Sequence, residues 1–194
     1  MSNSLEAAIQ KIHAIADVVC ENQMYFWPGF DPLDDDPAKF FRKHKIEFDG
    51  DLFIRYPVKA TFHPLTKSQI EKEERELGFT LPSDYKTLLQ TFGEFHLPGT
   101  ASICLNAPAA ALQSTHSQWC EPDEPLCVLA ISSYWQSSDG NSIGYVRAGD
   151  ALGCELFEFN HELRYEGNDP VLWSKRISNS LADFVLEYLG KIGV

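Results

Sequence analysis

The most regular pattern of apolar and polar positions lies between residues 66 and 93. Thr66 and Gln69 stand three residues apart before the run IEKEEREL, which is the spacing of a capping box. We therefore predict a helix that begins at Thr66 and ends at Gly78. A second helix is predicted between Pro82, which suits a first helical turn, and Gly93. Its apolar residues recur at i, i+3, i+4 and i+7, as on a buried helix face: Tyr85, Leu88, Leu89 and Phe92.

The first 65 residues show a weaker pattern. Apolar residues at helical spacing predict a helix from about residue 4 to residue 20. Residues 24–50 are rich in aromatic side chains and interrupted by prolines, which favours an irregular segment whose aromatics are buried. Residues 52–58 have strand composition, and Pro57 favours an edge strand. We expect residues 1–65 to form a helical, aromatic-rich extension that packs on the core.

The remainder of the chain alternates between turn-rich and apolar stretches. Residues 96–125, rich in Pro, Ala, Ser and Gly, predict a long surface connection with a possible short strand at 102–105. Three strands are predicted at 126–132, 142–147 and 154–160, and a closing helix begins at Ser180. Because the strands are joined by short turns, we expect antiparallel pairing. The order of elements predicts an α+β fold, an antiparallel twisted sheet with helices packed mainly on one face.

Composition and charge narrow the classes of function. The net charge is -12, with 16 basic residues against 28 acidic ones, so binding to nucleic acid phosphates is not expected. An acidic surface instead attracts basic partners and speeds their encounter, although acidity also serves solubility alone. No apolar run is long enough to span a membrane, and the N-terminus lacks the features of a secretory signal. We therefore expect a cytoplasmic protein.

The five cysteines do not predict a disulfide framework. Their number is odd and their spacing is loose, so reduced thiols in a cytosol are the simpler expectation. Cys120 and Cys127 flank EPDEPL, a spacing that matches no common zinc site. Cys127 stands in the apolar run LCVLAI, where a small core residue is expected.

A search for catalytic and metal-binding patterns yields little. His161 and Glu162 are not followed by the second histidine of an HExxH motif. The motifs GxSxG, Walker A and GxGxxG are absent from the sequence. Cys154 and His161 could meet near one strand as a thiol and imidazole pair, although a strand residue and its exit turn explain both. The acidic cluster at 34–36 lacks the alternation and the glycine of a calcium loop. We expect no enzyme activity, no metal and no cofactor.

The order of motifs from residue 66 to residue 190 resembles the SUKH superfamily. A Thr-capped, Glu-rich helix ends in Leu-Gly and is followed by Leu-Pro, an acidic residue, Tyr and an apolar helix, as in LTKSQIEKEERELGFTLPSDYKTLLQTFG. The later family pattern is VLAISSYWQSSDGNSIGYVRAGD, then CELFEFNHE, then ISNSLADFVLEYL. Residues 66–194 are therefore expected to form a SUKH-like domain. Residues 1–65 have no counterpart in the family pattern, apart from an extra strand near residues 52–58.

What the resemblance implies is protein binding. The superfamily groups bacterial immunity proteins, which neutralise a cognate polymorphic toxin and often a nuclease, with a fungal regulator of cell-wall glucan synthesis. Nuclease domains tend to be basic, and residues 66–194 carry 18 acidic against 9 basic residues. The expected partner is thus a basic toxin domain. A regulatory or scaffolding role in cell-wall or envelope physiology is the alternative, and an enzyme with an unrecognised site is a weaker one.

Three segments are candidates for the partner surface. The first is the segment WCEPDEP, with Trp119, Glu121, Asp123 and Glu124, where the alternative is that the tryptophan only anchors its own loop. The second is a predicted hairpin tip with Trp135 and Asp139, where core packing of the tryptophan and a plain turn are the alternative. The third is the acidic face of the helix predicted from Thr66 to Gly78, although most charge runs of this kind are only a solvated face: Glu71, Glu73, Glu74 and Glu76. Trp173 is assigned to packing.

Overall fold

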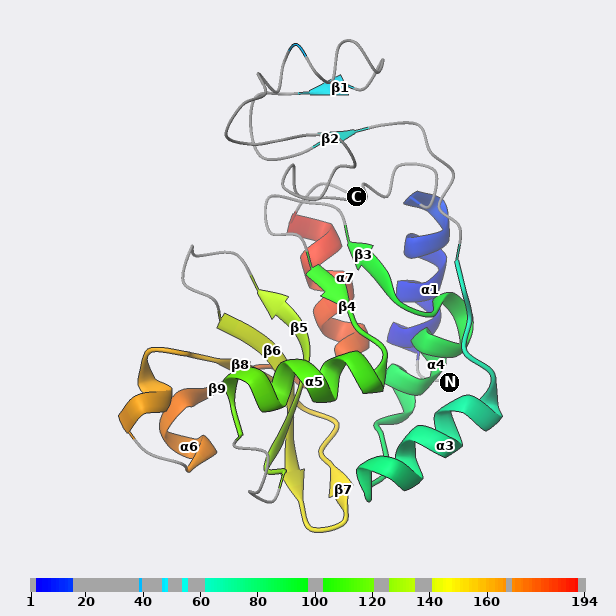
Figure 1. The fold of residues 1–194 in the computed structure, drawn as a ribbon. Coiled ribbons are helices and arrows are strands. Elements are labelled where there is room, and N and C mark those ends of the chain that lie inside the picture. The colour runs from blue at the N-terminus through cyan, green and yellow to red at the C-terminus, as the bar shows by residue number, and fades with distance from the viewer. Residues whose placement is uncertain are drawn as a thin grey trace.

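A computed structural model describes residues 3–15, 39, 47–48, 54–55, 62–97, 103–120, 126–134, 141–166 and 169–191 (Figure 1). The helices and strands follow in chain order as α1 (Asn3–Ile15), β1 (Glu47–Phe48), β2 (Ile54–Arg55), α3 (Lys67–Leu77), α4 (Ser83–Phe92), β3 (Phe95–Leu97), β4 (Ile103–Leu105), α5 (Pro108–Gln118), β5 (Val128–Tyr134), β6 (Asn141–Ala148), β7 (Ala151–Leu152), β8 (Leu156–Phe159), the 3-10 helix η2 (Leu163–Glu166), α6 (Pro170–Trp173), β9 (Ser174–Ser178) and α7 (Leu181–Lys191).

Helices α3 and α4 begin and end where the sequence predicts. The Thr66 hydroxyl accepts from the Gln69 amide at 3.3 Å and the Gln69 side chain accepts from the Thr66 amide at 2.8 Å, which confirms the capping box. Gly78 ends α3 in the left-handed region with φ 74°. The predicted apolar stripe of α4 is completely buried. At Gly93, a Cβ would stand 2.0 Å from the His63 carbonyl oxygen, so only glycine lets the chain pass there.

Asp84 and Tyr85 on α4 connect this helix to distant parts of the chain. One carboxylate oxygen of Asp84 accepts hydrogen bonds from the amides of Leu181 at 2.8 Å and Ala182 at 3.2 Å. These amides open α7 and have no partner within their own helix, so Asp84 caps α7. The Tyr85 hydroxyl donates to the Asn106 carbonyl oxygen at 2.6 Å. The Asp-Tyr pair, which is part of the family pattern, therefore connects α4 to α7 and to the segment before α5.

The larger described sheet is antiparallel, with the strand order β3-β4-β5-β6-β8-β9 and with β7 paired to β6. Strands β5, β6 and β8 correspond to the three predicted apolar runs and lie next to one another. Gly144 on β6 faces Ala130 on β5, and a Cβ there would lie 2.1 Å from the Leu129 carbonyl oxygen. The glycine thus permits the close approach of two strands beside a register shift in β5.

The core lies between the sheet and the helices α1, α4 and α7. Leu129 and Ile131 of β5 and Ile143 and Tyr145 of β6 belong to one buried cluster with residues of all three helices. Figure 1 shows α1, α4 and α7 together on this side of the sheet. The predicted α+β class, with an antiparallel sheet and its helices, is confirmed. A smaller cluster, described below, fills the opposite face.

The prediction for residues 96–125 is partly wrong. The strand predicted at 102–105 is present as β4, but β3 precedes it and residues 108–118 form helix α5 instead of a connection. Ala107 stands at the N-cap and offers no side-chain acceptor. The missing acceptors come from elsewhere, because Glu94 accepts from the Ala107 amide and Glu73 of α3 accepts from the Ala109 amide. A helix capped by distant residues leaves little local signal in the sequence.

Helix α5 also completes the sheet. Thr115 is completely buried, and its hydroxyl donates to the Ala111 carbonyl at 2.7 Å and accepts from the Ala130 amide of β5 at 2.8 Å. The Asn106 amide, just before α5, donates to the Ile131 carbonyl at 2.9 Å. The edge of β5, which β4 pairs with only at Tyr134, is therefore covered by Asn106 before α5 and by Thr115 in the last turn of α5.

Part of the N-terminal extension is described. Helix α1 starts as predicted and packs on α7 and α4 through its buried residues Leu5, Ala8 and Ile12. Strand β2 lies within the strand predicted at 52–58 and pairs with β1. Residues 16–20 of the predicted helix, most of the aromatic segment and the acidic cluster at 34–36 lie outside the described residues.

Candidate functional site

The second buried cluster forms a rigid aromatic base on the face of the sheet opposite α7. Trp119, at the end of α5, lies 5.3 Å from the ring of Trp173 and 5.5 Å from that of Phe159. Its indole nitrogen donates to the Ser142 hydroxyl at 3.1 Å. The side chain of Trp119 is 1% exposed, which matches the loop-anchoring alternative and leaves no indole surface for a partner. Trp173 is also buried, so its assignment to packing is confirmed.

Arg164 ties the outer segment η2 to this base. Its Nε donates to the Trp119 carbonyl oxygen at 2.9 Å, and its guanidinium carbon lies 5.8 Å from the centre of the Trp173 ring. A guanidinium over an aromatic ring is attracted by the ring face. The contacts fix η2 against the end of α5, at the point where the chain enters the segment with Glu121, Asp123 and Glu124.

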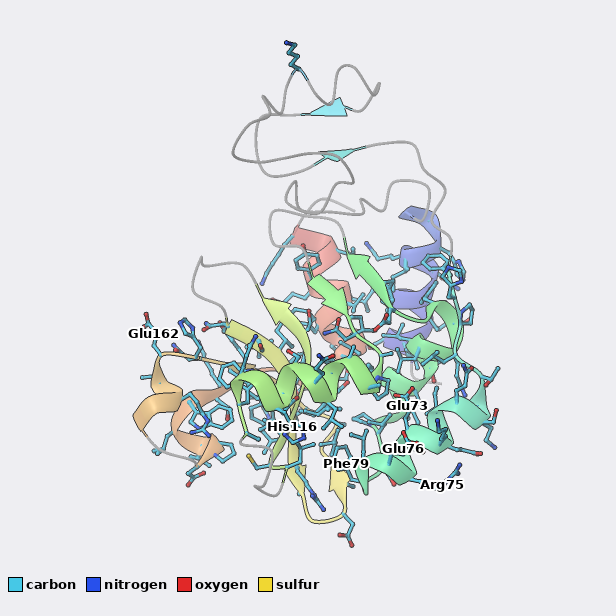
Figure 2. All side chains as sticks on the ribbon, viewed as in Figure 1. Glu73, Arg75, Glu76, Phe79, His116 and Glu162 are labelled. Carbon is cyan, nitrogen blue, oxygen red and sulfur yellow. The ribbon has the colours of Figure 1, made fainter. Side chains whose placement is uncertain are left out.

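The outward side of η2 and α6 combines exposed apolar and acidic residues. Val171 is 80% exposed, Leu172 is 53% exposed and Leu163 is 37% exposed, and they are the large apolar side chains recorded as exposed among the described residues. Glu162 and Asp169 are exposed beside them in the chain. Figure 2 shows Glu162 at the end of the molecule far from Glu76 on α3. We call Leu163, Val171, Leu172, Glu162 and Asp169 the η2–α6 surface.

An exposed apolar group with a charged rim is typical of a protein-binding surface. The η2–α6 surface was not predicted from the sequence, because PVLW has the composition of any short apolar run. The aspartate that caps α6 is a signal that could have found it: Asp169 accepts from the Val171 amide at 3.0 Å, which starts a short helix and turns Val171 outward.

The other predicted contact residues lie outside the described part of the chain. These are Glu121, Asp123 and Glu124 in the segment after Cys120, and Trp135 and Asp139 between β5 and β6. Their place in a partner surface stays a prediction.

The acidic face of α3 makes contacts within the molecule, and two of its glutamates bond to other segments. Glu73 caps α5 through the Ala109 amide at 2.9 Å, and Glu74 accepts from the Leu81 amide at 2.8 Å and from Lys86 Nζ at 3.0 Å. Glu71 and Glu76 pair with lysines one turn away, at 3.6 Å and 3.5 Å. Burial is the main cause that raises the pKa of Glu73, whereas its bond from Ala109 acts in the opposite direction. Each of the four glutamates thus has a partner inside the molecule.

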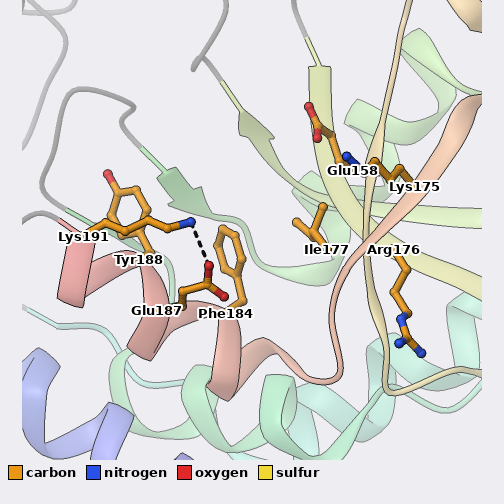
Figure 3. Close-up of a pocket in the computed structure, with 8 residues that line it drawn as sticks. All are labelled: Glu158, Lys175, Arg176, Ile177, Phe184, Glu187, Tyr188 and Lys191. Atoms are coloured by element: carbon orange, nitrogen blue, oxygen red, sulfur yellow. Dashed lines mark ion pairs between the residues drawn. The ribbon is translucent and has the colours of Figure 1, made fainter.

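A hollow of about 290 Å³ lies between α7 and the strands β8 and β9 (Figure 3). Its lining mixes charged, aromatic and aliphatic residues: Glu158, Lys175, Arg176, Ile177, Phe184, Glu187, Tyr188 and Lys191. Figure 3 shows the ion pair between Lys191 and Glu187, whose charged atoms are 2.8 Å apart and whose side chains are largely exposed. The residues that line this hollow include no cysteine, serine or histidine.

The thiol and imidazole pair considered from the sequence does not form. His161 Nδ1 lies 3.2 Å from the Asn141 side-chain oxygen, at the end of β8. Cys154 stands before the start of β8, and a strand of this length alone spans about 13 Å. The two groups are therefore outside hydrogen-bond reach. Within the described ranges no three His, Cys, Asp or Glu residues gather as metal ligands, and no helix has the length and apolarity to cross a membrane.

The fold and its contacts define an α+β scaffold whose signature residues cap helices and whose outer surfaces suit contacts with other proteins. Residues 64–187 match the SMI1 / KNR4 family (SUKH-1), so the chain belongs to this family. A comparison with the curated proteins finds no match. The family is generally non-catalytic, and membership supports an immunity or regulatory role exercised through protein contacts.

Proposed function

We propose that the chain is a cytoplasmic immunity protein that binds a cognate, basic bacterial toxin domain, such as a nuclease, and blocks it. The observation that carries the proposal is the family match over residues 64–187 in a part of the chain with a strong acidic excess. Residues 66–194 hold 18 acidic and 9 basic residues, which is a charge of -9 out of the total of -12. A surface of this sign competes electrostatically with the nucleic acid that a basic nuclease binds.

The η2–α6 surface is the best supported place for this partner. Its apolar centre gains by losing contact with water, and its carboxylates complement a basic surface. The aromatic base beneath it is fixed by Arg164 and by the stacked Trp119 and Trp173, so little conformational entropy is lost on binding. Glu121, Asp123 and Glu124 follow Trp119 and Cys120 directly in the chain, and we include them in the proposed surface.

The hairpin residues Trp135 and Asp139 form a second, separate part of the proposal. They stand between β5 and β6, whose ends carry Tyr134 and Asn141. The side chain of Asn141 donates to that of Glu158 at 2.9 Å and contacts the ring of His161. His161 directly precedes Glu162 in the chain. The strand ends that hold this hairpin are thus connected to the start of the η2–α6 surface.

Co-expression with toxin candidates encoded beside this chain tests the proposal. We expect growth of cells that produce the cognate toxin domain to be rescued by the wild-type chain. Val171→Asp and Glu162→Lys should weaken the rescue, because the first removes apolar contact at an 80% exposed side chain and the second reverses a rim charge. Glu71→Lys, a charge reversal of equal size on α3, is the matched control and should rescue fully.

Two outcomes would count against the proposal in different ways. If no neighbouring toxin candidate is neutralised, the immunity role fails and a regulatory role in the cell envelope gains support. If rescue occurs but is weakened equally by Glu162→Lys and Glu71→Lys, the immunity role holds and the η2–α6 surface is the wrong place for the partner.

A further inference from the structure

Two cysteine thiols meet where α5 ends and β5 begins. The sulfur atoms of Cys120 and Cys127 are 3.6 Å apart, and both thiols are free. Cys120 is 3% exposed, whereas Cys127 is partly exposed and opens the pair toward the surface. The sequence spacing excluded a common zinc site, and no other reason for this contact was evident from the pattern.

The backbone on both sides of the pair is held in place. The Cys120 amide donates to the Thr115 carbonyl at 3.1 Å, so Cys120 continues from the last turn of α5. The Arg147 amide donates to the Cys127 carbonyl at 2.8 Å, which pairs Cys127 with the neighbouring strand. A disulfide needs a sulfur separation of about 2.05 Å, so the thiols have to approach by about 1.5 Å. Side-chain rotation and small backbone shifts supply movements of this size.

The surroundings favour a thiolate on one of the two sulfurs. The two sulfur atoms are within hydrogen-bond distance, the backbone of Cys127 and Val128 favours a thiolate on Cys120, and Arg164 adds positive charge nearby. The hydrogen bond from the Cys127 thiol is the largest cause that lowers the pKa of Cys120 to about 6. The same hydrogen bond raises the pKa of Cys127 above its ordinary value. The pair therefore combines a nucleophilic sulfur with a neighbouring protonated thiol.

We propose that Cys120 and Cys127 form a reversible intramolecular disulfide when the chain meets hydrogen peroxide. The Cys120 thiolate attacks one peroxide oxygen and becomes a sulfenic acid, while the other oxygen leaves and takes up a proton as water. The Cys127 sulfur then attacks the sulfenic sulfur and loses its proton, and the hydroxyl leaves as a second water. Two thiols are oxidised and one peroxide is reduced to two waters, which balances the step.

The proposal stands independently of the proposed function. Hydrogen peroxide is the suitable class of oxidant, because its small size reaches a sulfur that is 3% exposed. A bulky disulfide such as oxidised glutathione has to meet the partly exposed but protonated Cys127 first. We therefore expect peroxide to oxidise the pair faster than glutathione disulfide at equal concentration.

The test uses the reduced full-length chain and hydrogen peroxide, followed by alkylation of the remaining thiols and peptide mapping. We expect a peptide pair joined through Cys120 and Cys127, with the loss of two hydrogens, and its disappearance after dithiothreitol. Cys154→Ser removes an exposed thiol elsewhere and should leave the rate of oxidation unchanged. Cys127→Ser removes the second thiol, so Cys120 should accumulate as a sulfenic acid that dimedone labels.

The wild-type peptide map decides the proposal even where a variant fails to fold. If peroxide consumes the thiols without producing the Cys120–Cys127 cross-link, the proposal is wrong. The same conclusion follows if the cross-linked peptide persists in dithiothreitol, or if Cys154 reacts first and the pair reacts only after the chain has unfolded, as circular dichroism at each time point would show.

Discussion

A few buried polar side chains connect elements that are far apart in the sequence. Asp84 is 8% exposed, and its two oxygens accept from its neighbour Tyr85 and from the first two residues of α7. Thr115 is completely buried and satisfies the Ala130 amide on β5. Buried polar groups of this kind stabilise little when satisfied but are costly to break, because the partner amides are left without water. They therefore determine which elements lie side by side.

Replacement of Asp84 by alanine should lower the free energy of unfolding by about 2 kcal/mol, since α7 loses its cap and two amides are left without an acceptor. Asp84→Asn should cost less, because one acceptor oxygen remains. Urea unfolding followed by circular dichroism measures both. Asp150→Ala, at an exposed turn, serves as the control and should change the free energy by less than about 0.5 kcal/mol. A loss at Asp84 no larger than at Asp150 would show that α7 does not need this cap.

The thiol pair gives the stability a pH dependence of a defined sign. The pKa of Cys120 is lowered in the folded chain from 9.0 to about 6, so between these values the folded state binds fewer protons than the unfolded state. The free energy of unfolding should therefore rise from pH 6 to pH 9. This stability is lost as the pH falls through about 6. Urea unfolding across this range should show a flatter profile for Cys120→Ser than for wild type and Cys154→Ser, and equal slopes in all three would refute the assignment.

At the scale of elements, a helix or strand could be predicted from the sequence where its own residues carry the signals that form it. Helices α3, α4 and α7 were predicted because their apolar stripes lie within their own residues. Helices α3 and α7 also have local caps at Thr66 and Ser180, to which Asp84 adds a distant cap on α7. Helix α5 was missed because its caps come from Glu73 and Glu94. Strand β9 was missed because its middle, Lys175 and Arg176, is exposed and polar, and its partner β8 alone makes it a strand. Tertiary contacts decide both elements.

Glu73 of α3 and Glu94 accept hydrogen bonds from amides at the start of α5, and substitution of each glutamate tests this capping. Glu73→Ala and Glu94→Ala should each lower the free energy of unfolding by about 1 kcal/mol, because each leaves one amide at the start of α5 without an acceptor. Glu76→Ala removes an exposed ion pair on the same helix as Glu73 and should change it by less than about 0.5 kcal/mol. Thermal or urea unfolding of the three variants provides the measurement. Similar losses in all three variants would mean that charge, and not capping, is responsible.

At the scale of the whole molecule, the charges are used unevenly. The glutamates of α3 take part in caps and in ion pairs with lysines, so part of the acidic charge on this helix is already paired within the molecule. The η2–α6 surface was not predicted, since the exposure of Val171 and Leu172 depends on how Trp173 of α6 packs against Trp119. The acidic composition suggests the charge sign of the proposed partner, whereas the proposed place of contact could be chosen only from the three-dimensional arrangement. Glu162 and the α3 glutamates lie at opposite ends of the molecule (Figure 2).

Because Glu162 and the α3 glutamates are far apart (Figure 2), substitutions at the two places should affect association with a partner differently. At physiological salt, charges further apart than about 8 Å are largely screened, so only carboxylates near the contact steer a partner effectively. With a toxin domain that the chain neutralises, we expect the association rate constant from stopped-flow or surface plasmon resonance to fall about tenfold between about 0.05 M and about 0.5 M salt. Glu162→Lys should slow association and reduce this salt dependence, while Glu71→Lys should do neither. If the two reversals act alike, steering comes from the total charge of the chain, and the partner does not approach through the η2–α6 surface.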